Sequence, residues 1–271
     1  MLKFVILSYN HPVITARCVS SVLKFLPAEN VALLHNGSEN LHIQELKNQF
    51  PQIQHWHLEK NYGYSAGVNE AFRKSFETCE WIFLMTNDTE LTRWDLEISS
   101  LEVGLYSPKI WLRKEGRIDS CGGLFNSRRG RLQHLREPLT KKDLTWGQYL
   151  YAPGTAFLLS RAVHEKLGGM DETLHTYWDD VDFGARATKQ NIFMSFLPGV
   201  QLIHQGRKTT GKDSFYTGYL FHRNRLLVSW RHCPNSLKWM LVPLLGKFLK
   251  FKYQIKNQSS IERFAHSRRW R

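Results

Sequence analysis

Cysteine is scarce in this 271-residue sequence, and its spacing forms no metal-binding or disulfide pattern. The four cysteines, at positions 18, 79, 121 and 233, include no Cys-x-x-Cys pair. We therefore expect neither a zinc site built on cysteine nor a disulfide framework, and a reducing compartment is favoured. The opening residues, MLKFVILSYN, lead directly into a short strand-like run without a basic segment and a long apolar core. We accordingly expect no signal peptide.

Acidic residues are fewer than basic ones, and the imbalance lies at one end of the chain. Thirty-seven Lys and Arg against 24 Asp and Glu give a formal net charge of +13. Residues 223–271 contain 12 basic residues and one acid, whereas the other 222 residues contain 25 basic and 23 acidic ones. A nearly neutral body is thus followed by a basic tail, and charge alone leaves phosphate, lipid and nucleic acid open as its partner.

Low-complexity segments, internal repeats and clear linkers are also absent. A content of 42% hydrophobic and 13% aromatic residues is typical of a globular protein and excludes disordered and collagen-like chains. The length suffices for a large core. One α/β domain followed by a tail is the simplest description.

Short apolar runs alternate with helical patterns over the first 90 residues. Strands are predicted at Phe4–Ser8, Val31–Leu34, His55–Leu58 and Trp81–Met85. Helices are predicted at Thr15–Leu26, Leu41–Phe50 and Ala66–Phe76. This alternation indicates βαβ units and a parallel sheet with right-handed crossovers. Ligands of such sheets bind at the carboxyl ends of the strands.

The second half is less regular. Residues 100–150 are rich in Gly, Arg and Lys, and we expect loops and hairpins there. Further strands are predicted at Ala156–Leu159, Phe193–Leu197 and Val200–His204. Helices are predicted at Ala162–Leu167 and Asp180–Gln190.

Several segments follow the order found in the family-two inverting glycosyltransferases of GT-A fold. They are VILSYN, HNGSEN, NYGYSAGVNEAF, FLMTNDTEL, GTAFLLSRAVHEKLGGMDE, YWDDVDFGARATKQN, LIHQG and HRNRLL. Over about residues 3–230 the chain resembles the bacterial rhamnosyltransferase-like branch in particular. The resemblance implies the GT-A nucleotide-diphospho-sugar transferase fold, an α/β fold with a Rossmann-like mixed sheet flanked by helices. We expect this domain at residues 1–230 and a basic amphipathic helical tail at 231–271.

Asp88 follows the fourth predicted strand, in a segment that resembles the family's DxD-type metal motif. A nucleotide-sugar donor releases a diphosphate whose charge a divalent ion usually stabilises, and a carboxylate suits Mn²⁺ or Mg²⁺. The family's first carboxylate is here Thr86 or Asn87, so Asp88 must serve together with the phosphates. A plain turn is the alternative. The resemblance also implies a role near the metal or diphosphate for His204, which could instead be structural.

The turns at Tyr9-Asn10 and at Asn36 are expected to hold the base and ribose of the donor. His35 stands where many family members have an acid, which leaves the nucleobase open. The family's N-x-G-x-x-x-G-x-N loop is matched by Asn61, Gly63, Gly67 and Asn69. Glycines in this loop would let the backbone approach the nucleotide. A simple glycine-bearing turn before a helix is the alternative.

The densest acidic cluster is formed by Asp179, Asp180 and Asp182. Neighbouring carboxylates raise one another's pKa, and one that lies near the donor sugar can accept the proton of an acceptor hydroxyl. The resemblance implies that Asp180 is this base, with Asp179 as the second candidate. Acids in the first turn of a helix also complement its dipole, which would account for Asp182.

Further positions are assigned by the resemblance alone or by residue type. Gly154 and Thr155 occupy the place that lines the acceptor side in the family, and Trp178 could stack on a sugar ring or lie in the core. Arg207 and Lys208 could neutralise the diphosphate or form a solvated basic turn.

Residues 237–255 mix apolar and basic side chains. Their longest uncharged stretch, Trp239–Gly246, contains Pro243 and is far shorter than the roughly 20 residues of a spanning helix. The composition suits a helix in the surface of an anionic membrane, with Lys247, Lys250, Lys252 and Lys256 on its polar side. Packing of the apolar residues on the body is the alternative.

These features predict a metal-dependent, inverting glycosyltransferase that moves a hexosyl or deoxyhexosyl group. Its donor would be a UDP-, dTDP- or GDP-sugar, and its acceptor a saccharide or lipid-linked saccharide. The resemblance and the tail together imply bacterial surface polysaccharide synthesis, such as lipopolysaccharide or capsule, at the cytoplasmic face of the membrane. A nucleic-acid-binding protein is the alternative suggested by the charge, although the body is nearly neutral and carries no known nucleic-acid-binding motif. The acids disfavour a second alternative, a non-catalytic carbohydrate-binding relative.

Overall fold

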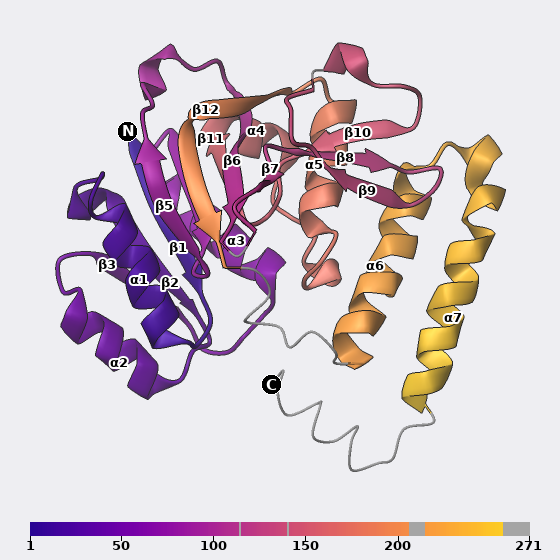
Figure 1. Cartoon of the computed structure of the whole chain (residues 1–271). Coiled ribbons are helices and arrows are strands. Elements are labelled where there is room, and N and C mark those ends of the chain that lie inside the picture. The colour runs from indigo at the N-terminus through magenta and orange to yellow at the C-terminus, as the bar shows by residue number, and fades with distance from the viewer. Residues whose placement is uncertain (114, 140, 206–214, 257–271) are drawn as a thin grey trace.

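The computed structural model describes residues 1–113, 115–139, 141–205 and 215–256 (Figure 1). The strands are β1 (Leu2–Ser8), β2 (Val31–Asn36), β3 (Gln54–Leu58), β4 (Trp81–Thr86), β5 (Thr89–Trp94), β6 (Gly104–Leu112), β7 (Ile118–Ser120), β8 (Gly123–Asn126), β9 (Arg131–His134), β10 (Gln148–Tyr151), β11 (Ala156–Ser160) and β12 (Phe193–His204). The α-helices are α1 (Pro12–Val22), α2 (Asn40–Gln49), α3 (Tyr64–Ser75), α4 (Arg161–Leu167), α5 (Asp179–Lys189), α6 (Phe215–His232) and α7 (Val242–Lys256). Short 3-10 helices are η1 (Ala28–Asn30), η2 (Ile98–Ser100), η3 (Lys141–Asp143), η4 (Glu172–Leu174) and η5 (Asn235–Leu241).

A mixed sheet forms the centre of the molecule. Its strand order is β3-β2-β1-β4-β11-β6-β12-β5, with β7 paired to β6. The first four strands are parallel, as predicted, and β11 then runs antiparallel to both β4 and β6. A second, antiparallel sheet has the order β10-β8-β9. The α/β architecture expected from the sequence is confirmed.

The alternation of side chains along β1 produces the two core layers. Phe4 and Ile6 pack in the cluster that contains α1 residues such as Val19. Val5 and Leu7 point to the opposite face, into the cluster that contains Phe72 of α3 and residues of α4 and α5. A parallel strand covered on both faces reads as a continuous apolar run, which is why these strands were predictable.

Three strands of the main sheet differ from the prediction. The segments Phe193–Leu197 and Val200–His204 form one strand, β12, whose register against β6 shifts between Leu197 and Gln201. Pro198 and Gly199 lie at this shift, and such residues indicate a break in a sequence although here they form a bulge. β6 spans the centre of the sheet within a region predicted as loops, and β5 is a largely polar strand that the pattern did not indicate.

The tail begins as part of the body. α6 continues through residue 230, where we expected the domain to end, and α7 lies beside it as a helical hairpin (Figure 1). Arg225 of α6 donates to the carbonyl of Gly130, at 2.6 Å, in the turn between β8 and β9. A Cβ at Gly130 would meet the Leu244 side chain of α7 at 2.4 Å. Among the described helices, none has both the length and the apolarity needed to cross a bilayer.

Candidate active site

Asp88 lies in the turn between β4 and β5, where it is only 6% exposed. The Thr86 hydroxyl donates to its Oδ1 at 2.7 Å, and His204 Nε2, at the end of β12, lies 3.2 Å from its Oδ2. Burial raises the pKa of Asp88, but the contacts with His204 and Thr86 outweigh it and hold the pKa below the ordinary value. Burial lowers the pKa of His204, whereas Asp119 and Asp88 raise it, to about 9 overall. The two predicted metal ligands thus meet as an ion pair.

The chemistry of this pair fits a divalent cation. It offers one carboxylate, which suits Mn²⁺ and Mg²⁺, and one imidazole nitrogen, which suits a transition metal such as Mn²⁺ better than Mg²⁺ and must give up its proton to bind. In the described ranges no three His, Cys, Asp or Glu residues are grouped so as to hold a metal. The remaining ligands would therefore be the oxygens of a bound phosphate or water.

The paired acids lie at the start of α5, directly after residues with left-handed backbone. His175, Tyr177 and Trp178 have φ values of 64°, 67° and 69°, which are uncommon for non-glycine residues and often occur at functional sites. Asp179 is 3% exposed, and its Oδ2 accepts from the Ser65 hydroxyl at 3.0 Å. Burial and the neighbouring carboxylate of Asp180 raise the pKa of Asp179 to about 7.

Asp180 is the more accessible of the two. It is half-buried, and burial also raises its pKa. The backbone N–H of Gly154 donates to its Oδ2 at 2.8 Å, and the N–H of Val181 donates to its Oδ1 at 2.8 Å. A carboxylate that is fixed by backbone donors, partly exposed and more basic than usual is suited to accept a proton.

The segment 153–155 connects the helix that carries Asp180 to the strand that precedes Asp88. Gly154 holds Asp180 through its N–H, and its carbonyl accepts from the Tyr64 hydroxyl at 2.5 Å. The next carbonyl, that of Thr155, accepts the N–H of Thr86 at 3.0 Å. Consecutive residues thus bind the helix that carries Asp180 and the strand that leads to Asp88. Gly154 and Thr155 have these backbone roles in the structure, and their expected contact with an acceptor stays a prediction.

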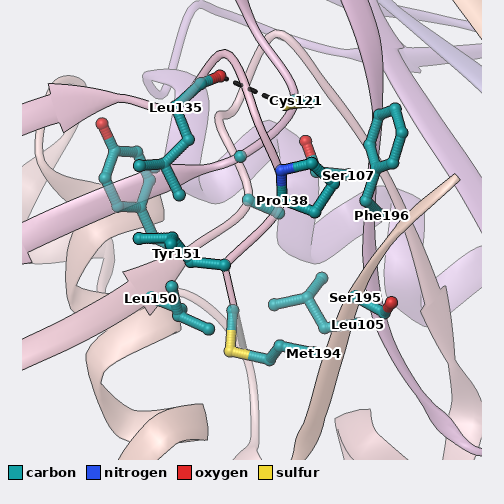
Figure 2. A pocket seen from close by; sticks show the side chains of 14 residues that line it. Leu105, Ser107, Cys121, Leu135, Pro138, Leu150, Tyr151, Met194, Ser195 and Phe196 are labelled. Atoms are coloured by element: carbon teal, nitrogen blue, oxygen red, sulfur yellow. Dashed lines mark hydrogen bonds between the residues drawn. The ribbon is translucent and has the colours of Figure 1, made fainter. Parts of the chain in front are cut away.

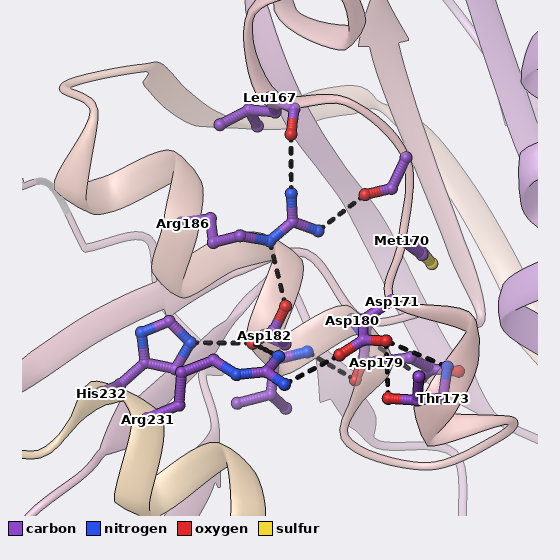
Figure 3. Close-up of polar contacts among 12 residues, drawn as sticks. Leu167, Met170, Asp171, Thr173, Asp179, Asp180, Asp182, Arg186, Arg231 and His232 are labelled. Carbon is purple, nitrogen blue, oxygen red and sulfur yellow. Dashed lines mark hydrogen bonds and ion pairs between the residues drawn. The ribbon is translucent and has the colours of Figure 1, made fainter.

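Asp182 has a structural role. It is fully buried and lies 3.0 Å from Arg186 Nε, 2.8 Å from Arg231 Nη1 and 2.9 Å from His232 Nε2 (Figure 3). Arg186 also donates to the carbonyls of Leu167 and Gly169. Burial raises the pKa of Asp182, but these partners outweigh it and hold the pKa below its ordinary value. The third acid of the cluster therefore connects α5 to α6.

The predicted nucleotide loop is held by its own polar groups. Asn36 Nδ2 donates to the carbonyl of Gly63 at 2.9 Å, and Asn61 Oδ1 accepts the Gly63 N–H at 2.9 Å. Gly63 has φ +93°, and a Cβ there would meet the ring of His175 at 2.4 Å. The structure thus brings Asn36, Asn61 and Gly63 together, and places this loop against the segment that precedes the paired acids.

The last two residues of the predicted loop lie on α3. Gly67 packs α3 on β1, since a Cβ there would meet Leu7 at 2.8 Å. Asn69 donates to the carbonyl of Met170 and accepts its N–H, which ties α3 to the loop before η4. Both residues have these packing and hydrogen-bonding roles in the structure, and their expected contact with the nucleotide stays a prediction.

The first turn connects β1 to the start of α2. The Asn10 N–H donates to Ser38 Oγ at 2.9 Å, and Asn10 Oδ1 accepts the N–H of Glu39 at 3.0 Å. Tyr9 is half-buried beside it. His35 is fully buried, and burial, together with His57 and His55, lowers its pKa to about 3. A neutral imidazole thus replaces the acid of the family motif.

Trp178, predicted to contact the acceptor, is not at an open surface. Trp178 is 3% exposed and packs edge-on against Phe125 and Phe221, so its ring belongs to the core and does not face a sugar. Arg207 and Lys208 lie outside the described residues. A pocket of about 30 Å³ lies between the two sheets and is lined by apolar side chains that include Leu150 and Met194 (Figure 2). Its volume is too small for a nucleotide or a sugar. Substrates must bind outside it.

Sequence reasoning missed two polar residues beside His204. Asp119 of β7 lies 3.9 Å from His204 Nδ1, and its other oxygen lies 3.5 Å from Nδ1 of His134 in β9. Contacts with His134 and His204 keep the pKa of Asp119 below its ordinary value. Both residues come from the region that was predicted as loops, and only the isolated acid in GRIDSCGG gave a signal.

The chain is similar to known glycosyltransferases in sequence and in fold. Residues 4–98, which include most of β1, all of β2 to β5 and Asp88, match the model of the glycosyl transferase family 2. This match covers about a third of the chain, which is similar to a family 2 glycosyltransferase domain there. It is 28% identical over 181 residues to the low-salt glycan biosynthesis hexosyltransferase Agl10 of Haloferax volcanii, a match that covers 62% of this chain and 57% of that relative. The chain therefore spans little more than half of that protein's length.

Two further similarities cover more of the chain than the segment that matches the family 2 model. The N-acetylglucosaminyl-diphospho-decaprenol L-rhamnosyltransferase of Mycobacterium tuberculosis is 28% identical over 252 residues, covering 78% of this chain and 79% of the relative. The crystal structure of GalNAc-T7 with UDP, GalNAc and Mn²⁺ has a TM-score of 0.58 and 16% identity, and the match covers 90% of this chain and 55% of that one. The fold is the GT-A type, as the sequence predicted.

Proposed function

We propose that this protein transfers a sugar from a nucleotide-diphosphate donor to a hydroxyl group of a saccharide or lipid-linked saccharide, with inversion at the anomeric carbon. The observation that carries this proposal is that two consecutive residues connect the two groups of acids. Gly154 binds Asp180, and Thr155 binds Thr86, whose hydroxyl donates to Asp88. The names of the relatives, one a hexosyltransferase and one a rhamnosyltransferase with a diphospholipid-linked acceptor, support the reaction and the acceptor class. Synthesis of a bacterial surface polysaccharide is the proposed setting.

The proposed reaction is a single displacement. Asp180 accepts the proton of the acceptor hydroxyl while that oxygen forms its bond to the anomeric carbon of the donor. The bond from this carbon to the diphosphate oxygen breaks, and the nucleoside diphosphate leaves with the electron pair. The Gly154 and Val181 N–H groups fix the carboxylate of Asp180, so little reorganisation is needed when the proton moves.

Asp88 and His204 would hold a divalent cation beside the leaving group. Such a cation, when bound, stabilises the negative charge that develops on the diphosphate. The Thr86 hydroxyl fixes one oxygen of Asp88, so the other faces His204. The Mn²⁺ and UDP in the structure of GalNAc-T7 support a metal of this kind.

A panel of UDP-, dTDP- and GDP-sugars tests the proposed function. We expect one donor, in the presence of Mn²⁺, to raise the melting temperature, because a ligand at 100 times its dissociation constant stabilises a protein by about 2.7 kcal/mol. NMR of the product formed from that donor should show the inverted anomer. Absence of stabilisation by every donor, together with salt-sensitive retention on DNA, would favour the nucleic-acid alternative.

The helical hairpin at the end of the described chain supports peripheral binding to an anionic membrane. Leu241 and Leu244 are buried in the hairpin, whereas Trp239, Val242 and Leu249 are 70%, 63% and 51% exposed. The exposed residues recur at helical spacing, on a different side from the buried ones. Lys247 and Lys250 are also exposed on α7. Buried and exposed apolar residues thus lie on different sides of η5 and α7, which supports packing on the body by one side and membrane binding by the other.

Replacing Trp239, Val242 and Leu249 together by serine is expected to abolish most sedimentation with anionic liposomes at low salt, because an interfacial helix binds through its exposed apolar area. The matched control replaces three apolar residues with similar exposure on the body, Val13, Leu41 and Val103, by serine. This control should sediment like the wild type. Equal sedimentation of the two variants would contradict the assignment of the surface.

A further inference from the structure

We infer that Asp119 is a positioning residue for the metal site: it orients the imidazole of His204 toward the cation. The inference rests on the proposed function, because it presupposes that Asp88 and His204 hold a metal. It adds a residue from β7, outside the segment that matches the family 2 model and outside the motifs that the sequence analysis identified.

The two ring nitrogens of His204 have different surroundings. Its Nε2 faces Asp88, 3.2 Å away, and is therefore the nitrogen that can bind the same cation as that carboxylate. Its Nδ1 is buried and lacks a hydrogen-bond partner among the described residues. A histidine that binds a metal through one ring nitrogen carries its proton on the other, and that N–H is usually donated to a carboxylate or carbonyl.

The carboxylate of Asp119 faces Nδ1 of His204. Its Oδ2 lies 3.9 Å from His204 Nδ1, which is an ion-pair distance from which a small rotation of either side chain forms a hydrogen bond. Its Oδ1 is held 3.5 Å from His134 Nδ1. The carboxylate is thus placed between imidazoles from β12 and β9, and its side chain is 21% exposed.

The backbone around this contact is fixed by pairing. β6 lies between β7 and β12 and pairs with both of them. The N–H of Arg113, which follows β6, donates to the carbonyl of His204 at 3.1 Å, and Leu112 binds the carbonyl of Arg117 at 3.0 Å. Backbone hydrogen bonds therefore hold in place the strands that carry Asp119 and His204. A residue that orients a metal ligand requires such support.

Titration with Mn²⁺ alone, followed by the electron paramagnetic resonance signal of the free ion, tests this role without any need for turnover. We expect Asp119→Ala to weaken Mn²⁺ binding by about 10- to 100-fold, the usual effect of losing such an outer-sphere partner. Asp119→Asn should lie between the alanine variant and the wild type, because the amide oxygen still accepts the Nδ1 proton without the charge. The control, Asp95→Ala, removes an exposed acid paired with Arg93 and should bind Mn²⁺ like the wild type.

Two outcomes would overturn the inference, and they differ in their cause. If Asp88→Ala weakens Mn²⁺ binding while both Asp119 variants bind normally, Asp119 has no positioning role, and a lowered melting temperature would then mark it as purely structural. If Asp88→Ala itself leaves Mn²⁺ binding unchanged, the proposed metal site fails and the role of Asp119 fails with it. The isosteric asparagine variant keeps the test valid if the alanine variant does not fold.

Discussion

Asp180→Asn is expected to lower the rate of sugar transfer by about 10²-fold or more while leaving donor binding intact. Asparagine keeps the shape of the side chain and an oxygen that can accept the Gly154 N–H, but it cannot take up the proton of the acceptor hydroxyl. Loss of a group that acts only in the transition state lowers kcat and kcat/KM together. Steady-state kinetics and calorimetric titration with the donor would measure the two effects separately.

Asp179→Asn is the matched control for this prediction. Asp179 is buried and accepts from Ser65, so its replacement should change stability more than the chemical step. If Asp179→Asn abolishes transfer and Asp180→Asn does not, the base has been assigned to the wrong member of the pair.

Asp182→Ala is expected to reduce the free energy of unfolding by about 3–5 kcal/mol, because it leaves buried charged partners without their counter-charge. Arg231 and His232 both contact this carboxylate from α6, and Arg186 contacts it from α5. Urea unfolding would measure the loss. Asp171→Ala is the control, since Asp171 also pairs with Arg231, at 2.9 Å, but lies nearer to the surface.

A loss below about 1 kcal/mol for Asp182→Ala, no larger than that of the control, would contradict the connecting role of this residue.

The same contacts bear on the proposed division of the chain at residue 230. Removal of the chain after Trp230 would take away Arg231 and His232, so we propose that the functional boundary lies beyond α6.

Much of the main sheet and the acids Asp88, Asp179 and Asp180 could be predicted, because the residues that indicate them are neighbours in the sequence. β1, β2 and β4 are buried on both faces and read as apolar runs, and Asp88 follows one of them directly. The paired acids occur beside each other in the sequence, so their proximity needs no knowledge of the fold. The family resemblance then supplied an expected role for each of them.

The remaining parts depend on contacts between residues that are distant in the sequence. Asp119 and His134 lie in strands of three and four residues, which are too short to produce a recognisable period. Asn69 matches a loop motif in the sequence, but the position of Met170 in space decides what it binds. Trp178 illustrates the same limit, since only the packing of Phe125 and Phe221 shows that its ring is enclosed.

The measurement that tests the central claim most directly is calorimetric titration of the wild type and of Asp88→Ala with the nucleotide-sugar that the panel identifies, with and without Mn²⁺. We predict that Mn²⁺ strengthens donor binding to the wild type, and that Asp88→Ala loses this effect. Donor binding to Asp88→Ala with the wild-type response to Mn²⁺ would contradict the assignment of this strand end as the metal and diphosphate site.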